Sequence, residues 1–352
     1  MSNELITQLL KISGSAYAGF AAGTLLESEP APKTAETPGA FDLWKTHFES
    51  RISELETALT FERPELFAAG MSWAKEAFVA RGIPESDLAL SLDALADVLQ
   101  EELPENAADP LGAYIDAARE ALESEVQSAQ PLEPADAVSR AALEYVVDVL
   151  EGNSRSAIRN LEASVESGLT VSEVCDQILT AAQREIGRLW HAGQIGVAEE
   201  HFATMTAQKA LTILFHRCEA KPPNGKTALI TCPAGNVHDL GLRMLAEHFD
   251  VEGWRSILLG ADMPTPDLVE SVDHYAPDVL VLSATLSRHL VGLRDTIAAI
   301  RAADTEFANV PILAGGNALN SVDGLWQQIG ADAWSPSIAE AVSQANRLLQ
   351  LN

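Results

Sequence analysis

The stretch TALITCPAGNVHDLGLRMLAEHF, residues 227–249, decides the fold of the C-terminal part of the chain. It begins with an apolar run typical of a buried strand (227–231), passes through a turn (232–236) and continues as an amphipathic helix (237–249). One histidine, His238, lies between the strand and the helix. Because ligands of an open α/β sheet bind beyond the carboxyl ends of its strands, we expect His238 to face a binding crevice.

The composition limits the classes of function. The formal net charge of −28 disfavours direct nucleic-acid binding, which needs clustered Lys and Arg to neutralise phosphate. No apolar run approaches the ~20 residues of a membrane-spanning helix, and the N-terminus lacks a basic segment before its apolar part, so we expect no signal peptide. The three cysteines, at no metal-like spacing, are typical of a cytoplasmic protein; they are Cys175, Cys218 and Cys232.

The first part of the chain is predicted to be helical. Residues 1–26 indicate a short helix, and residues 27–39, rich in Pro, Thr and Glu, indicate a linker or mobile loop. Over residues 40–125 apolar side chains recur at three- and four-residue steps, which predicts an all-α bundle of about four helices, comparable to a globin-like domain. The repeat includes Phe41, Trp44, Phe48, Ile52, Leu55 and Leu59. The predicted breaks are at 63–64, 82–84 and 103–110.

A linker is predicted at residues 127–134, QSAQPLEP, and four helices follow it. Their predicted ranges are 135–151, 154–167, 171–192 and 197–219. After KPPNG (221–225) the pattern changes to short apolar runs that alternate with helices, which predicts a doubly wound, Rossmann-like parallel sheet of five strands. The predicted strands are 227–231, 255–259, 279–283, 311–314 and 331–334. The later helices are predicted at 266–275, 290–303, 321–328 and 338–349. The predicted domains are 1–130, 131–221 and 222–352.

Two further loops follow predicted strands. Ser283 and Thr285 lie in LSAT, and Gly315 and Gly316 lie in LAGGN. Paired glycines leave room for a ligand to lie against the backbone, although an ordinary tight turn also explains them. Taken singly, His238 is more often a loop residue than a ligand. Because all these residues follow parallel strands, we expect them to line one groove.

Taken in order, these residues resemble the cobalamin-binding domain family, whose pattern is Asp/Glu-x-His-x-x-Gly, a Ser-x-Leu/Thr strand end and a Gly-Gly pair. The resemblance covers residues 225–352 and implies that His238 is the lower axial ligand of cobalt. It also implies a cofactor site made by Asn236, Val237, His238, Asp239, Leu240, Gly241, Ser283, Thr285, Gly315 and Gly316. Of these, Gly241, Ser283, Thr285, Gly315 and Gly316 would line the slot for the displaced nucleotide tail. Asn236 stands where the family has a carboxylate; its amide oxygen can orient the imidazole but adds no negative charge to the ligand.

A second motif lies in residues 186–201, IGRLWHAGQIGVAEEH, where Trp190 is followed after nine residues by Glu200 and His201. This W-x9-EH spacing resembles the light-sensing B12 family of regulators. The resemblance implies that Trp190 covers the adenosyl group of adenosylcobalamin, that Glu200 and His201 contact it, and that His191 takes the upper cobalt position after photolysis. The alternatives are a core tryptophan and a solvated helix cap. Four-helix caps also occur in corrinoid methyltransferases.

The N-terminal part of the chain indicates whether the protein signals through DNA or through other proteins. Regulators of the light-sensing family often carry a basic winged-helix domain, whereas residues 1–125 are acidic, so we expect signalling through a partner protein or light-dependent homo-oligomerisation. The whole layout resembles the photocobilins, which pair B12 with a bilin such as biliverdin. No cysteine precedes Cys175, which excludes a covalent bilin here. A non-covalent slot could use Trp44, His47, Phe48, Arg51, Trp73, Lys75 and Phe78; the alternative is that these aromatics form the domain core.

The leading hypothesis is therefore a non-catalytic light sensor in which photolysis of the cobalt–carbon bond changes domain packing and oligomeric state. The alternatives are a corrinoid carrier for methyl transfer and a scaffold that has lost its cofactor, with Asn236 as the sign of loss. The remaining histidines are expected to be structural or solvent-facing, with His289 the one placed to approach the groove; they are His216, His248, His274 and His289. Asp262 and Asp267 are expected to be loop and helix-cap residues.

Overall fold

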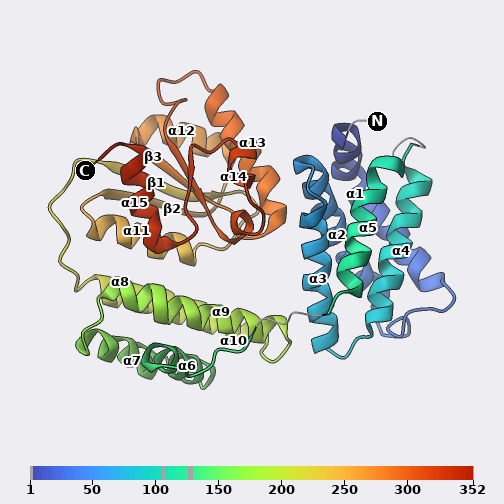
Figure 1. Cartoon of the computed structure of the whole chain (residues 1–352), viewed down its shortest axis with the longest axis horizontal. Coiled ribbons are helices and arrows are strands. Elements are labelled where there is room, and N and C mark those ends of the chain that lie inside the picture. The colour runs from blue at the N-terminus through green and yellow to red at the C-terminus, as the bar shows by residue number, and fades with distance from the viewer. Residues whose placement is uncertain (1–2, 105–107, 126–129, 352) are drawn as a thin grey trace. The chain divides into compact units, whose positions relative to one another are not determined.

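The computed structural model describes residues 3–104, 108–125 and 130–351. Contacts divide the chain into two compact units, residues 1–128 with 191–193, and residues 129–190 with 194–352. Figure 1 labels the α-helices of both and the strands β1, β2 and β3. The predicted second and third domains fall into one unit, so the boundary predicted near residue 221 stays a prediction. Within the described ranges, no helix is both long and apolar enough to span a bilayer.

The first unit is helical, as predicted, and its first helix is a main part of the core. Its helices are α1 (Asn3–Glu27), α2 (Ala40–Phe61), α3 (Pro64–Ala80), α4 (Glu85–Glu102) and α5 (Ala108–Glu123). The helix predicted over residues 1–26 is confirmed as α1, although with 25 residues it is not short. It lies against α2 and α4. Gly14 permits this approach, since a Cβ there would lie 3.2 Å from Ile52 Cγ2.

The segment between α1 and α2, predicted as a linker or mobile loop, is built of hydrogen-bonded turns. Ala35 N–H donates to Pro32 O at 2.9 Å, and Trp44 Nε1–H donates to Thr34 Oγ1 at 3.1 Å. On α2 the predicted apolar face is buried except for Phe41, which is 46% exposed. The break predicted at 103–110 and the linker at 127–134 lie partly outside the described residues.

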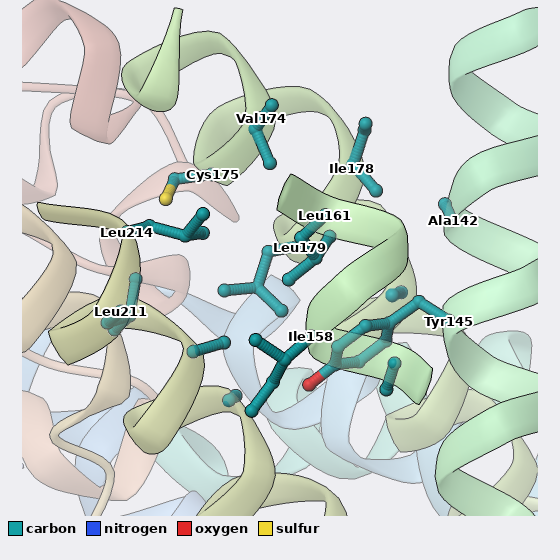
Figure 2. Packing of buried hydrophobic residues seen from close by; sticks show 14 of the residues in the cluster. Ala142, Tyr145, Ile158, Leu161, Val174, Cys175, Ile178, Leu179, Leu211 and Leu214 are labelled. Atoms are coloured by element: carbon teal, nitrogen blue, oxygen red, sulfur yellow. The ribbon is translucent and has the colours of Figure 1, made fainter. Parts of the chain in front are cut away.

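The helical cap of the second unit consists of α6 (Ala137–Leu150), α7 (Ser154–Glu166), α8 (Val171–Glu173), η2 (Val174–Leu179), α9 (Thr180–His191) and α10 (Val197–Phe215). The helix predicted over 171–192 is thus interrupted by a π-helical stretch, η2. Thr170 caps the N-terminus of α8, where its Oγ1 accepts from Glu173 N–H at 3.2 Å. Figure 2 shows the apolar core between the helices, including Tyr145, Ile158 and Leu179. Met244 of the sheet domain also joins this core, which joins the cap to the sheet domain.

The sheet domain is a doubly wound parallel sheet, as predicted, with strand order β2-β1-β3-β4-β5. The strands are β1 (Thr227–Pro233), β2 (Arg255–Met263), β3 (Val279–Ser283), β4 (Ile312–Gly315) and β5 (Ala333–Trp334). Helices α11 (Leu240–Val251) and α15 (Ile338–Leu348) pack on one face. Helices α12 (Thr265–Tyr275) and α13 (Leu290–Ala302) lie over the other (Figure 1).

Several predicted boundaries in the sheet domain are wrong. β1 continues to Pro233 and β2 to Met263, because these two residues still pair in the sheet. The helix predicted from residue 237 begins only at Leu240. The helix predicted over 321–328 is reduced to α14 (Leu325–Gln328), after a 3-10 turn, η4 (Asn317–Asn320), because Gly324 has a φ of 81° and interrupts it.

Candidate functional site

Three loops meet at the carboxyl edge of the sheet, after β1, β3 and β4. Ser283 pairs in register with Gly315, and Ala284 N–H donates to Gly315 O at 3.0 Å. At Gly316 φ is +99°, and a Cβ there would lie 2.3 Å from the carbonyl oxygen of Ala284. Only glycine fits this approach, which explains the second glycine of the pair. The structure thus brings Ser283, Gly315 and Gly316 together, with Thr285 half-buried in the same loop.

Asn236 is the fully buried centre of the loop after β1. Its Nδ2 donates to Ser283 O at 3.2 Å, while its Oδ1 accepts from His238 N–H at 3.1 Å. A hydrogen bond from a backbone N–H to the side chain two residues earlier competes with helical hydrogen bonding. It explains why α11 begins only after His238. The same oxygen lies 3.1 Å from His238 Nδ1. The amide thus joins the two loops and also orients the imidazole.

This arrangement fixes the tautomer of His238. The Asn236 amide donates to a carbonyl through Nδ2, so Oδ1 is the atom that faces the histidine. An amide oxygen only accepts, so Nδ1 of His238 must carry the proton and Nε2 keeps its lone pair. That is the form in which an imidazole binds a metal through Nε2, with the other nitrogen held by a second residue. Asn236 therefore supplies the orientation that a carboxylate would supply, without its charge.

The electrostatics around His238 favour the neutral ring. Partial burial and the nearby Arg288 lower the pKa of His238, and Glu200 of the cap acts in the opposite direction. The outer part of the residue remains exposed. The influence of Glu200 shows that the first turn of α10 lies close to the loop after β1. A neutral, half-exposed imidazole is available as a ligand near neutral pH.

The loop after β1 is held at its tip by β2. Asp262, at the end of β2, accepts from Gly235 N–H at 2.7 Å, and its own N–H donates to Asn236 O at 3.0 Å. The prediction that Asp262 is a loop residue is wrong, because it lies within β2, and from there it supports Asn236. Arg243 Nε–H donates to Asp239 Oδ2 at 2.9 Å. Leu240 packs against the apolar core of the cap. At Gly241 a Cβ would meet no described atom within 4 Å, which leaves open space beside the helix start.

Large apolar side chains are exposed at the end of α9, on α10 and in the loop after β1. Trp190, at the end of α9, is 38% exposed, and so is not the core residue of the alternative interpretation. The others are Val197, Phe202, Met205 and Val237. Such a group of exposed apolar residues typically marks a binding surface. Nearby, Glu200 Oε2 lies 2.7 Å from His201 Nδ1, and its Oε1 accepts from Thr204 at 2.9 Å. Glu200 thus bonds to both His201 and Thr204.

His289 belongs to this site, although its sequence position alone indicated a structural role more strongly. It lies just before α13, and its ring centroid is 6.1 Å from that of His238. It is 5% exposed. Burial, Arg288 and His238 lower its pKa to about 4. Its Nε2 is buried with no partner among the described residues. The sequence placed His289 near the LSAT loop, but ring orientation depends on contacts that no sequence pattern reports.

His191 is grouped with the first unit, not with the residues around His238. Its ring stacks on Trp73, with centroids 4.1 Å apart and an interplanar angle of 24°. Burial lowers the pKa of His191, and its Nε2 lies 3.8 Å from Glu76. Because His191 and His238 lie in different units, the role of His191 as an upper ligand stays a prediction.

The residues proposed for a bilin slot are mainly core residues of the first unit. Trp44 and Phe48 are fully buried. Lys75 Nζ donates to the carbonyl oxygens of Leu122 and Ser124, at 2.7 and 2.8 Å, and Arg51 donates to Gly70 O at 2.6 Å. His47 lies against Phe78, at 5.5 Å between centroids, and burial lowers the pKa of His47 to about 3. Both cations already have partners within the protein.

The residues at the sheet edge fit a large, flat metal macrocycle with polar groups on its periphery. His238 offers a metal-binding nitrogen, the exposed Val237 beside it offers an apolar contact, and Gly316 lets the loops after β3 and β4 approach closely. The unpartnered Nε2 of His289 is a polar atom that such a ligand could satisfy. Cobalamin carries a metal ion, a flat ring and polar groups on the ring periphery, which correspond to these three features.

Comparisons with known proteins report similarity over both the helical cap and the sheet domain. Residues 226–343 match a family model described as a B12 binding domain, and residues 142–215 match a second model of the same description. The structure of the monomethylamine corrinoid protein of Methanosarcina barkeri superposes with a TM-score of 0.51 at 21% identity, covering 59% of this chain and 97% of that one. This likeness shows the fold.

Related proteins fall into two groups. The chain is 31% identical over 142 residues to the HTH-type transcriptional repressor CarA of Myxococcus xanthus, over 40% of this chain but only 46% of CarA. It is 25% identical to CarH of the same organism, over 57% of this chain and 66% of CarH. It is 28% identical to dimethylamine corrinoid protein 1 of Methanosarcina acetivorans, over 51% of this chain and 84% of that protein. The cap and the sheet domain thus both match B12-binding domains, and cobalamin binding by this chain is supported.

Proposed function

We propose that this protein is a light sensor that binds adenosylcobalamin and does not turn over a substrate. The observation that carries the proposal is the tautomer of His238, fixed by Asn236, in the same unit as the exposed Trp190. His238 would hold the cobalt from below. Trp190, Glu200 and His201 would cover and contact the adenosyl group, in accord with the W-x9-EH spacing.

Adenosylcobalamin, when bound, supplies a cobalt–carbon bond that visible light breaks. The protein supplies the two faces around it. Nε2 of His238 would hold the cobalt, and Asn236 holds the imidazole of His238 without adding negative charge. Trp190 offers a flat apolar lid, while the carboxylate of Glu200 and the imidazole of His201 can hydrogen-bond ribose and adenine.

The output in this proposal is a change of packing. Trp190 and the first turn of α10 would contact the adenosyl group, and its loss would change the contacts of both. Because α10 packs on α11 of the sheet domain, a shift of the cap changes that interface and with it the oligomeric state or the surface offered to an effector protein. The net charge of −28 disfavours nucleic acid as a direct partner, and we propose no membrane partner.

A corrinoid carrier for methyl transfer is the second candidate. The observation in its favour is that the match covers 84% of dimethylamine corrinoid protein 1, compared with 46% of CarA. A carrier must expose the upper face of its corrinoid to a methyltransferase. The Trp190 side chain and the ordered Glu200–His201 pair suit a closed upper face better. Turnover of methylcobalamin with a methyltransferase would reverse this ranking.

A non-covalent bilin such as biliverdin is proposed only as a second chromophore, on the resemblance of the domain layout. Lys75 and Arg51 would have to release their carbonyl partners to bind its propionates. The test is an absorption spectrum of the protein expressed with biliverdin. A bound bilin gives a band separate from those of the corrinoid, and a spectrum without one removes the bilin from the proposal.

The main experiment uses full-length protein reconstituted with adenosylcobalamin in the dark. We expect green light to change both the absorption spectrum and the elution volume in size-exclusion chromatography. Protein loaded with hydroxocobalamin is the matched control, and should show neither change because it has no cobalt–carbon bond. An unchanged spectrum and elution volume of the adenosyl form would reject the light sensor, and would leave the carrier as the better interpretation.

A further inference from the structure

His289 is a buried polar residue without a full set of partners. It is 5% exposed, and its backbone N–H donates to Leu286 O at 2.9 Å. Its Nδ1 lies 3.2 Å from Leu286 N–H. These two bonds close a small ring with Leu286 and fix the side chain. Nε2 has no partner among the described residues, although buried polar atoms are nearly always hydrogen-bonded.

The bond from Leu286 fixes the tautomer of His289. A backbone N–H can only donate, so Nδ1 of His289 must be the acceptor and carries no proton. The proton of the neutral ring is then on Nε2. His289 is therefore the opposite of His238, whose Nδ1 is protonated and whose Nε2 has the lone pair. His238 thus offers a ligand atom, and His289, whose ring centroid lies 6.1 Å from that of His238, offers a hydrogen-bond donor.

This difference excludes one other interpretation of the pair. Two neighbouring imidazoles could hold a single metal ion if both had free lone pairs at Nε2. His289 does not, because binding a metal through Nε2 would require it to lose the bond from Leu286 or to become an imidazolate. The part of the chain that the structure describes also contains no group of three or more metal-binding side chains. The unsatisfied atom is a donor and needs an acceptor.

We infer that Nε2–H of His289 donates a hydrogen bond to an oxygen acceptor on the lower face of the bound corrinoid, beside the axial ligand His238. The inference rests on the cobalamin binding proposed above. Its placement follows from the loop after β3, which carries both Ser283, bonded to Asn236, and His289. A corrinoid offers two kinds of oxygen there, the phosphate and ribose of the nucleotide tail and the amide carbonyls of the ring periphery.

Two substitutions separate this role from support of the loop. In His289→Asn the side-chain oxygen can take the place of Nδ1 and still accept from Leu286, but the Nε2 donor is lost. In His289→Gln the amide nitrogen can take the place of Nε2, but the acceptor for Leu286 is lost. We expect His289→Asn to keep the stability of the free protein and to bind hydroxocobalamin roughly five- to tenfold more weakly. His289→Gln should bind within about twofold of wild type and unfold at a lower temperature.

The experiment is an absorbance titration of both variants and wild type with hydroxocobalamin and with cobinamide, which lacks the nucleotide tail. Weaker binding of His289→Asn to hydroxocobalamin only assigns the acceptor to the tail, and weaker binding to both assigns it to the ring periphery. Unchanged affinity of His289→Asn overturns the inference while leaving the proposed function intact. If wild type binds neither corrinoid, the proposed function fails, and this inference fails with it.

Discussion

The side-chain oxygen of Asn236 lies 3.1 Å from Nδ1 of His238, while its amide nitrogen donates to the carbonyl of Ser283 at 3.2 Å. One buried residue thus orients the proposed cobalt ligand and joins the loops after β1 and β3. A carboxylate could accept from Nδ1 but could not donate to Ser283. The amide is therefore compatible with a working site, which argues against a scaffold that has lost its cofactor.

Asn236→Asp should separate these two roles. We expect the free protein to lose about 1–3 kcal/mol of stability, because a buried carboxylate oxygen would face the Ser283 carbonyl without a hydrogen. The bound cobalamin should show a stronger histidine ligand, since negative charge on the second residue raises the basicity of the imidazole. Urea unfolding of the free protein and the absorption spectrum of the loaded protein measure the two effects. Stability equal to wild type would show that the bond to Ser283 is dispensable.

His238→Ala should remove the lower ligand. We expect cobalamin affinity to fall at least about tenfold, and the histidine-ligated spectrum to disappear. Added imidazole should restore that spectrum by entering the space left by the side chain. His274→Ala is the matched control, because His274 is exposed on α12 and its ring meets only Tyr275 in the described structure. A histidine-ligated spectrum retained in His238→Ala would assign the ligand to another residue.

The glycine pair should divide into a structural and a binding position. In Gly316→Ala the new Cβ would meet Ala284 O at a positive φ, so we expect a loss of about 1–3 kcal/mol in the free protein. In Gly315→Ala the Cβ would lie 3.6 Å from Ser335 O, an ordinary contact. We expect this variant to keep its stability and to bind cobalamin more weakly, because the methyl group narrows the slot. Equal effects of both on stability would contradict this division.

His248 should make the stability of the second unit depend on pH. Burial lowers its pKa, but Asp176 and the Met244 carbonyl raise it by more, so the net shift is upward. The protonated ring on α11 faces Asp176 of the cap at 3.4 Å. Because the folded pKa is raised, this stabilisation is fully present below the unfolded pKa of ~6.5 and is lost as pH rises through the folded pKa.

The measurement is the melting temperature of wild type and of His248→Gln, from a pH below the unfolded pKa of histidine to a pH above the folded pKa of His248. The lowered pKa values of His238 and His289 add a dependence of opposite sign to both proteins, so the difference between the two curves isolates His248. We expect wild type to lose more stability than His248→Gln as pH rises. Parallel curves would show that His248 and Asp176 do not form an effective ion pair.

The sequence was sufficient for the sheet, because buried parallel strands such as 279–283 are continuous apolar runs bounded by polar turns. It was also sufficient to place His238, Ser283 and Gly316 at one edge, since all three follow parallel strands. It was less reliable at the start of α11, where the side chain of Asn236 competes with the helix for a backbone N–H. Local polarity patterns do not report such bonds.

Other features lay beyond sequence reasoning for a different reason. The roles of His238 and His289 depend on which ring nitrogen meets a donor and which meets an acceptor, and this is set by contacts between loops. The position of His191 depends on stacking with Trp73, a residue more than a hundred positions earlier. The interruption of the third cap helix by η2 leaves the apolar pattern nearly unchanged, so periodicity predicted one continuous helix.

That interruption lets the helix hold an extra residue while the residues after it keep nearly the same angular position. A π-helical turn holds one more residue than an α-helical turn, and each residue of an α-helix turns the chain by about 100°. Deleting one residue from η2 would therefore restore a regular α-helical turn and leave the direction of α9 and of Trp190 nearly unchanged. Deleting one residue from α9 itself, between Thr180 and Trp190, would instead turn the tryptophan by roughly 100° about the helix axis.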